Sequence, residues 1–298
     1  MYDIVILTEH RYINPKKTNW YINQVLLEDE ILLNAFKNLG IRTCKKAWDD
    51  ESFDWHKTKN AIFRTTWDYF EKFDRFFSWI ESTKNKTNFI NDSQIIKWNI
   101  NKNYLKDLTQ KGINIAPTIF IKKRENISLS SLFKSTKFNE AVIKPAISGA
   151  ARETYRINTS NYKRYEKIFN DLTQSECMIF QEFLHDIIVN GEISIILING
   201  KYTHAVKKTA KKGDFRVQDD HGGKVEIYHA NKKEISFAKE CIKACPCLPI
   251  YARVDIVKDN NNKLSLTELE LIEPELWFRH NPESAKILAK EIQKKIIK

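Results

Sequence analysis

Apolar and polar positions in the first third of the chain switch repeatedly between strand-like and helix-like spacing. The first apolar stretch is short and continuous, as in a buried strand, and the next apolar positions recur at helical spacing until Gly40, a typical helix stop. The pattern predicts strands over 3–8, 41–47 and 60–65 and helices over 23–39 and 70–82. This βαβ alternation predicts a small parallel-sheet domain over residues 1–97.

The remaining two thirds of the chain predict two further subdomains. Residues 98–185 mix short elements and are typical of a small α+β lid, whereas longer strands dominate residues 186–298. The expected lid helices span 101–112 and 161–172. The expected lid strands are a short one that begins at Pro117 and three over 140–145, 153–157 and 178–183. The expected C-terminal elements are strands over 192–199, 202–207, 224–229, 250–258 and 264–271 and helices over 232–245 and 282–297. The predicted fold class is therefore α/β at the N-terminus and α+β elsewhere.

Composition narrows the classes of protein that fit this pattern. Of 298 residues 42% are hydrophobic, and no apolar run approaches the ~20 residues of a membrane span. The N-terminus lacks the features of a signal peptide, so we expect a cytoplasmic protein without a membrane partner. The net charge of +11 raises the question of nucleic-acid binding. Because the lysines are scattered and interleaved with acids, the sequence disfavours nucleic acid and favours a small anionic substrate.

A predicted β-hairpin near the C-terminus carries several charged residues on one face. Residues two apart in a strand share a face, and the run 259–263 has turn chemistry. A turn centred between Asn261 and Asn262 pairs Asp255 with Glu268 and Arg253 with Glu270.

Three carboxylates at cross-strand distance repel one another unless a cation lies between them. Asp255, Glu268 and Glu270 offer only oxygen ligands, which suit a hard cation such as Mg²⁺. A solvated acidic hairpin explains the same charges equally well, so the hairpin alone leaves both interpretations open.

Lys144 ends a predicted strand, and a loop of small residues that includes Ser148 and Gly149 follows it. An ammonium group and an uncluttered loop suit phosphate, because main-chain N–H groups can approach the oxygens. An ordinary hairpin with an exposed lysine is the alternative. The glycine patterns of a P-loop and of a dinucleotide site are both missing.

The apolar strand over 178–183 leads into a segment with the chemistry that adenine requires, namely an apolar slot beside polar acceptors. A core strand with a polar edge explains the same residues. The candidate contacts are Glu182, Phe183 and Leu184 for adenine and Asp186 and Glu192 for ribose. Farther on, a basic loop over 207–218 contains Lys207 and Arg216 and suits closure over a triphosphate or a carboxylate, although charge runs are more often only solvated.

In chain order these motifs resemble those of the ATP-grasp ligases, in particular the prokaryotic glutathione synthetase-like branch and proteins similar to D-cycloserine synthetase. The resemblance covers roughly residues 60–280 and rests on Arg64–Tyr69, Trp98–Leu108, Ile143–Pro145, Gln181–Phe183, Asn190–Ser194, His204–Lys208, Asp214–Gly223, Ala252–Asp255 and Glu268–Pro274. Two positions depart from the family pattern: the phosphate loop is poor in glycine, and Glu270 stands where many ATP-grasp enzymes carry asparagine.

The resemblance implies an ATP-grasp fold in which a pre-ATP-grasp domain precedes two α+β subdomains that clamp ATP. It implies phosphate contacts at Lys102, Lys144, Ser148 and Gly149, adenine contacts at Glu182, Phe183 and Leu184, and a ribose contact at Asp186 or Glu192. It implies two Mg²⁺ ions, replaceable by Mn²⁺, at Asp255, Glu268 and Glu270. Arg253, with Lys207 and Arg216, would neutralise the transferred phosphoryl group.

The implied reaction joins a small amino-acid or peptide-like carboxylate to an amine through an acyl-phosphate, and releases ADP and phosphate. Phosphoryl transfer needs positioning and charge neutralisation more than a nucleophilic side chain, which agrees with the lack of a Ser-His-Asp or Cys-His signature. Two alternatives stay open: a phosphotransferase on the same fold, and a non-enzymatic nucleotide- or nucleic-acid-binding protein.

Substrate contacts are expected at the C-terminal edge of the parallel sheet, where ligands gather in such domains. The candidates are Arg64, Trp67, Arg216 and Glu273, although structural packing explains Arg64 and Trp67 equally well. A homodimer is also left open, because dimers are common in the resembled family.

Overall fold

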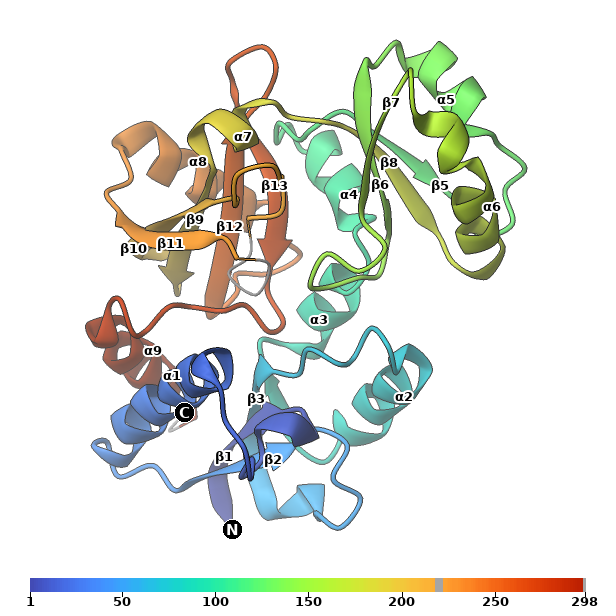
Figure 1. The fold of residues 1–298 in the computed structure, drawn as a ribbon. Helices are drawn as coiled ribbons and strands as arrows, with labels where there is room; N and C mark the ends of the chain where they lie inside the picture. The colour runs from blue at the N-terminus through green and yellow to red at the C-terminus, as the bar shows by residue number, and fades with distance from the viewer. Residues whose placement is uncertain (218–221, 297–298) are drawn as a thin grey trace.

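The computed structural model describes residues 1–217 and 222–296 and arranges them in three sheets, each covered by helices (Figure 1). Two sequence predictions, the end of the basic loop at Gln218 and the end of the last helix at Ile297, lie outside the described residues. No helix in the described part of the chain is long and apolar enough to cross a membrane.

The N-terminal sheet is parallel, with strand order β2-β1-β3-β4, as the βαβ pattern predicts. Its elements are β1 (Tyr2–Thr8), α1 (Trp20–Lys37), β2 (Thr43–Ala47), β3 (Thr58–Thr65), α2 (Phe73–Thr83) and β4 (Asn88–Ile90). In β1, Ile4 and Ile6 face the layer of α1, whereas Val5 and Leu7 face the layer of α2. Because both faces are buried, the strand is a continuous apolar run.

A second sheet, with order β5-β8-β6-β7, is antiparallel and forms the lid. Its elements are β5 (Thr118–Ile121), α5 (Leu129–Thr136), β6 (Glu140–Pro145), β7 (Tyr155–Asn158), α6 (Glu166–Ser175) and β8 (Met178–Glu182). In β6, Ala141 and Ile143 pack in the core that α5 and α6 cover. The alternate residues Val142 and Lys144 line the cavity on the other face, as expected for a strand.

The third sheet has the order β11-β10-β9-β12-β13 and is antiparallel. Its elements are α7 (Asp186–Asn190), β9 (Glu192–Ile198), β10 (Lys201–Thr209), β11 (Lys224–Tyr228), α8 (Lys232–Lys243), β12 (Tyr251–Lys258) and β13 (Leu264–Glu270). Along one face of β9, Ile196 and Ile198 pack against the N-terminal domain, whereas Glu192 lines the cavity. This sheet therefore supplies both a domain contact and a wall of the site.

Two helical segments pack against a different sheet from the one that the predicted domain boundaries assign to them. Helices α3 (Ser93–Asn99) and α4 (Tyr104–Gln110) pack into the core of the third sheet, so the lid is shorter than residues 98–185. The C-terminal helix α9 (Pro282–Ile296) packs beside α1 in the core of the N-terminal domain (Figure 1). Apolar periodicity marks a helix face but does not say which sheet covers it.

Two buried side chains of the connecting helices, Asn99 and Tyr104, hold the edge strand β13 in place. The Asn99 side chain donates to Leu269 O at 2.8 Å and accepts from Leu271 N at 2.9 Å. The Tyr104 hydroxyl accepts from Leu269 N at 2.9 Å. These contacts satisfy the free edge of the strand that carries Glu268 and Glu270.

Candidate active site

The charged hairpin of β12 and β13 has the predicted register, with Asp255 opposite Glu268 and Arg253 opposite Glu270. Carboxylate oxygens of Asp255, Glu268 and Glu270 lie within 4.8 Å of one another. Three oxygen donors at this spacing fit a hard divalent cation such as Mg²⁺. Glu268 and Glu270 line the cavity, whereas Asp255 is 1% exposed and contacts the lining residue Arg253.

The register is reached by a different route from the one predicted. Near the turn, Lys258 pairs with Leu264, which centres the turn on Asn261. A register shift between Asp255 and Ile256 then restores the predicted pairs. Thr267, at this irregularity, directs its hydroxyl to Glu192 Oε1 at 2.7 Å, so the bulge also ties β13 to β9.

Neighbouring cations set the charge of each carboxylate in this group. Burial raises the pKa of Asp255, but Arg253 and Lys208 outweigh it and lower the pKa to about 2. Burial likewise opposes ionisation of Glu268, and Lys102 and Lys144 still lower its pKa. Burial and the two other carboxylates raise the pKa of Glu270 well above its usual range, against the charge of Arg253. A cation bound among the three would relieve this repulsion.

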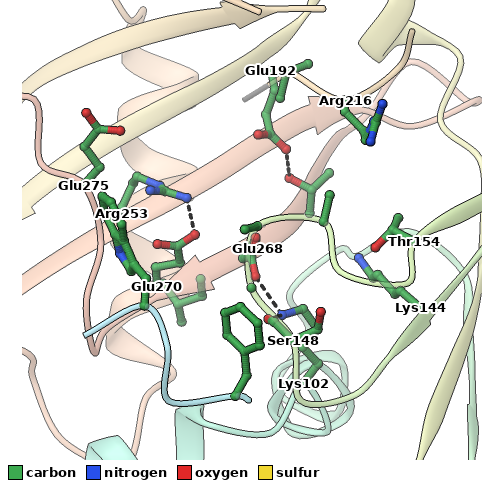
Figure 2. Close-up of a pocket in the computed structure, with 18 of the residues that line it drawn as sticks. Lys102, Lys144, Ser148, Thr154, Glu192, Arg216, Arg253, Glu268, Glu270 and Glu275 are labelled. Atoms are coloured by element: carbon green, nitrogen blue, oxygen red, sulfur yellow. Dashed lines mark hydrogen bonds and ion pairs between the residues drawn. The ribbon is translucent and has the colours of Figure 1, made fainter. Parts of the chain in front are cut away.

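Lys102 and Lys144 bring positive charge from the lid side of the cavity, as predicted from the sequence (Figure 2). Lys102 Nζ lies 2.9 Å from Glu268 Oε1 and donates to Ser148 O at 2.9 Å. Lys144 makes no ion pair within 4 Å among the described residues, and burial together with Lys102 lowers its pKa to about 8. An unpaired lysine in a cavity is suited to an anionic ligand.

The loop after Lys144 contains Ser148 and Gly149, which both line the cavity. Its backbone has positive φ at Ala150, Ala151 and Glu153, a conformation that residues other than glycine rarely adopt. Gly149 lies against Phe70 of the N-terminal domain, so that a Cβ placed there would be 2.7 Å from the ring. The lid loop therefore reaches the domain that is expected to bind the acceptor substrate.

The segment predicted to bind adenine lines the cavity where the lid joins the third sheet. The prediction for the Phe183 backbone needs correction, because its N–H donates to Glu140 O and its C=O accepts from Asn260. The Phe183 ring lies under the Arg156 guanidinium, 4.0 Å from it, and meets the ring of Phe215 edge-on. Leu184 N–H makes no hydrogen bond among the described residues, so it is the main-chain donor that remains for a base.

Two predicted residues line a different cavity. Lys207 and Asp186 line a second cavity of about 310 Å³ beside α7 and α8. The neighbouring Lys208 faces the main cavity instead, where it bonds Glu192 at 2.5 Å and Asp255 at 3.2 Å. The placement of Lys207 in the phosphate site is therefore wrong, and Glu192 rather than Asp186 is the ribose candidate in the cavity.

At the acceptor end of the cavity the structure separates the predicted substrate residues. Trp67 and Glu273 line it, whereas Arg216 lines the cavity next to Phe215, which contacts Phe183 of the adenine segment. Arg64 is buried under Phe278 and does not line the cavity. Arg216 is held by Asp214, 2.7 Å from its guanidinium. Further lining residues were missed because they lie outside the predicted helices and strands or at their ends: Glu9, Arg11, Tyr21, Tyr69, Phe70, Thr154, Glu275 and Trp277. Of these, Tyr21 lies in the first turn of α1, ahead of the predicted start of that helix at residue 23.

All three units contribute to one cavity of about 590 Å³, in which the carboxylates of the hairpin face Lys102 and the lid residue Lys144 (Figure 2). Residues 104–273, more than half of the chain, match the family model of the prokaryotic glutathione synthetase ATP-grasp domain. The chain belongs to this ATP-grasp family. Residues 4–91 of the ATP-grasp protein also match the model of the N-terminal domain of D-cycloserine synthetase DcsG.

Relatives of the ATP-grasp protein cover nearly its whole length. The cycloserine biosynthesis protein DcsG of Streptomyces lavendulae is 23% identical over 285 residues, which are 89% of this chain and 92% of that protein. The crystal structure of D-cycloserine synthetase DcsG has a TM-score of 0.87 at 21% identity and covers 98% of this chain and 99% of its own. D-alanine–D-alanine ligase from Bacillus anthracis, complexed with ATP, has a TM-score of 0.69 at 14% identity and covers 100% and 96%. The predicted ATP-grasp fold is confirmed, and the protein is an ATP-grasp ligase.

Proposed function

We propose that this ligase joins a small carboxylate to an amine through an acyl-phosphate intermediate, at the expense of ATP. The observation that carries the proposal is the pairing, in one cavity, of an oxygen-only carboxylate group with lining cations. The cations are Lys102, Lys144, Lys208 and Arg253, and the carboxylates are Asp255, Glu268 and Glu270. A triphosphate needs the cations, and the magnesium that accompanies it needs the carboxylates.

The hairpin carboxylates would hold Mg²⁺, with two ions as the stoichiometry that the family resemblance implies. Bound there, magnesium would screen the phosphate oxygens and help align them for in-line transfer. Lys102 and Lys144 would hold the phosphates from the lid side. Arg253 and Lys208 would stabilise charge that develops on the transferred phosphoryl group. The Leu184 N–H and the Phe183 ring would hold the base, and Glu192 the ribose.

Closure of the lid would protect the intermediate from water. An acyl-phosphate hydrolyses readily, so the site must exclude solvent until the amine attacks. The contact of Gly149 with Phe70 joins the lid loop to the N-terminal domain. This contact supports a reaction in two steps within one closed cavity, and a simple phosphotransferase has less need for it.

The acceptor end of the cavity supports an amino-acid-like substrate. Aromatic and acidic side chains dominate it, among them Trp67, Trp277 and Glu273. The relatives named above are a cycloserine synthetase and a D-alanine–D-alanine ligase. We therefore propose small amino acids, D-amino acids included, and their derivatives as substrates. Ligation of two molecules and cyclisation of one are both compatible with the site, and a homodimer stays a prediction.

Release of ADP and phosphate from Mg-ATP tests the proposal, with pooled amino acids and dipeptides as substrates and hydroxylamine as a small nucleophile. We expect a hydroxamate, or a product lighter by one water than its two substrates, by mass spectrometry. A single substrate that becomes lighter by one water would indicate cyclisation. A stable phosphorylated product would instead establish the phosphotransferase alternative. No ADP release with any pool, and no thermal shift with Mg-ATP, would contradict the proposal.

A further inference from the structure

Glu273 lies three residues beyond the last metal-ligand candidate, at the acceptor end of the cavity. The Trp67 indole N–H donates to Glu273 O at 3.0 Å and so fixes the main chain at this point. Tyr69 and Glu273 both line the cavity, and the Tyr69 side chain interacts with the Glu273 carboxylate so as to lower its pKa. Both partners come from the N-terminal domain, so the carboxylate is held at the boundary between the acceptor domain and the phosphate site.

This carboxylate differs from its neighbours because it has no cationic partner. In the described part of the chain, most carboxylates that line the cavity form an ion pair within 4 Å, namely Glu9, Asp68, Glu192, Glu268, Glu270 and Glu275. Glu71, Glu182 and Glu273 form none. Glu71 is exposed and Glu182 lies at the nucleotide end, so Glu273 is the unpaired carboxylate beside the expected acyl-phosphate.

The surroundings of Glu273 keep it ready to exchange a proton at neutral pH. Burial, with a smaller contribution from the charge of Glu268, raises its pKa to about 7 against the opposing influences of its own N–H, Lys102 and Tyr69. A group whose pKa lies near the working pH is best able both to accept and to release a proton. The carboxylates that contact Lys102 or Arg253 are committed to those cations and cannot serve in the same way.

We infer that Glu273 is the general base that deprotonates the attacking amine, and that Tyr69 is the residue that positions it. The inference rests on the proposed function. The ammonium form of the acceptor gives one proton to a Glu273 oxygen, and the freed lone pair attacks the carbonyl carbon of the acyl-phosphate. The C–N bond forms. The bond between the carbonyl carbon and the bridging phosphate oxygen breaks, and its electron pair leaves with the phosphate. The phosphate takes the second amine proton, and Glu273 returns its proton to solvent.

Two nucleophiles of nearly equal size separate this role from simple binding. Hydroxylamine is largely unprotonated at neutral pH and needs no base, whereas ammonia is almost entirely ammonium. With the carboxylate that supports hydroxamate formation in the wild type, we expect Glu273→Gln to lower amide formation from ammonia by roughly 100- to 10,000-fold. Hydroxamate formation and its accompanying ADP release should stay near the wild-type rate. Glu30→Gln, which changes an exposed carboxylate of α1 that does not line the cavity, is the control and should leave both rates unchanged.

Tyr69→Phe gives a second, independent measurement. Loss of the hydroxyl should raise the pKa of Glu273. The acidic limb of the pH–rate profile for amide formation from ammonia should therefore move to higher pH, while the rate with hydroxylamine stays level. Equal loss of both nucleophiles in Glu273→Gln, or an unmoved limb in Tyr69→Phe, would overturn the base role and leave the ligase proposal standing. A wild-type protein that forms neither product would overturn the proposed function, and this inference with it.

Discussion

Lys102 Nζ lies 2.9 Å from two oxygens of different units, Ser148 O in the lid loop and Glu268 Oε1 in the metal hairpin. The main chain repeats the connection, because Lys102 N donates to Ala146 O at 2.8 Å. One lysine therefore couples the position of the phosphate loop to the carboxylate group. Its own pKa stays raised, since Glu268 and Glu270 outweigh the effect of burial.

Replacement of Lys102 by methionine should weaken ATP binding and turnover together. The methionine keeps much of the aliphatic stem but removes the charge that Glu268 and the phosphates share. We expect kcat to fall roughly 100-fold or more, as for loss of one preorganised electrostatic contact. Calorimetric titration with a non-hydrolysable ATP analogue measures the binding part. An unchanged affinity together with an unchanged kcat would show that Lys102 only packs the loop.

Removal of single carboxylates should distinguish the two strands of the metal hairpin. Glu268→Gln should abolish turnover and leave the melting temperature nearly unchanged, because Lys102 keeps its bond to Ser148. Asp255→Asn should abolish turnover and also destabilise the fold by about 1–3 kcal/mol, because Arg253 and Lys208 would each lose one of their two buried carboxylate partners. Thermal unfolding and ADP release measure the two effects. Full activity in either variant would refute the metal assignment.

Adjacent lysines of β10 provide a matched pair, since Lys208 faces the active-site cavity and Lys207 the second cavity. Lys208→Met should lower kcat by at least about 100-fold, because it removes a cation bound to Glu192 and Asp255. Lys207→Met should leave kcat and the ATP affinity within error. Equal losses in both variants would mean that charge on the strand matters more than the direction of the side chain.

The same pair shows why only part of the site could be predicted from the sequence. The charged face of the hairpin was predictable from alternation along two strands joined by a short turn, but its register also depends on the shift between Asp255 and Ile256, which was not predicted. Strand β10 has a register irregularity between Tyr202 and His204, and the face of each later residue depends on it. The tertiary fold sets such irregularities, so the sequence alone does not indicate whether Lys207 or Lys208 faces the cavity.

A short helix explains the second misplaced residue. Asp186 starts α7, and its carboxylate accepts from Asn190 Nδ2 and Lys258 N. A strand continuing from β8 would have pointed Asp186 toward the ribose, but five helical residues turn it away. Helices of this length carry too few apolar positions to show periodicity, and Tyr69 and Glu9 lie in loops that show none. Chemistry at element ends was therefore predictable, and loop contributions were not.

Lys144 predicts a pH dependence of nucleotide binding. Its pKa in the free protein is lowered to about 8 by burial and Lys102, and a bound phosphate would raise it. Below pH 8 the lysine is protonated with or without ATP, so the affinity is level. Above this pKa binding must take up a proton, and the affinity should fall by up to about tenfold per pH unit. Calorimetry in buffers of different ionisation enthalpy should detect this proton uptake, and Lys144→Met should remove it. A level affinity up to about pH 10 in the wild type would show that Lys144 does not contact the phosphates.

Gly149 and Phe70 offer a test of lid closure that leaves the charges untouched. Gly149 has no positive φ, so alanine fits its backbone, but the new Cβ would lie 2.7 Å from the Phe70 ring. We expect Gly149→Ala to make the free energy of lid closure less favourable by about 1–3 kcal/mol. This should lower kcat/KM for ATP and speed the loss of the acyl-phosphate to water. Phe70→Ala alone should act mildly, and the double variant should recover most of the loss, because the clash is then absent. A double-mutant cycle on kcat/KM measures this coupling. Strictly additive effects would mean that the lid loop and the N-terminal domain do not meet during turnover.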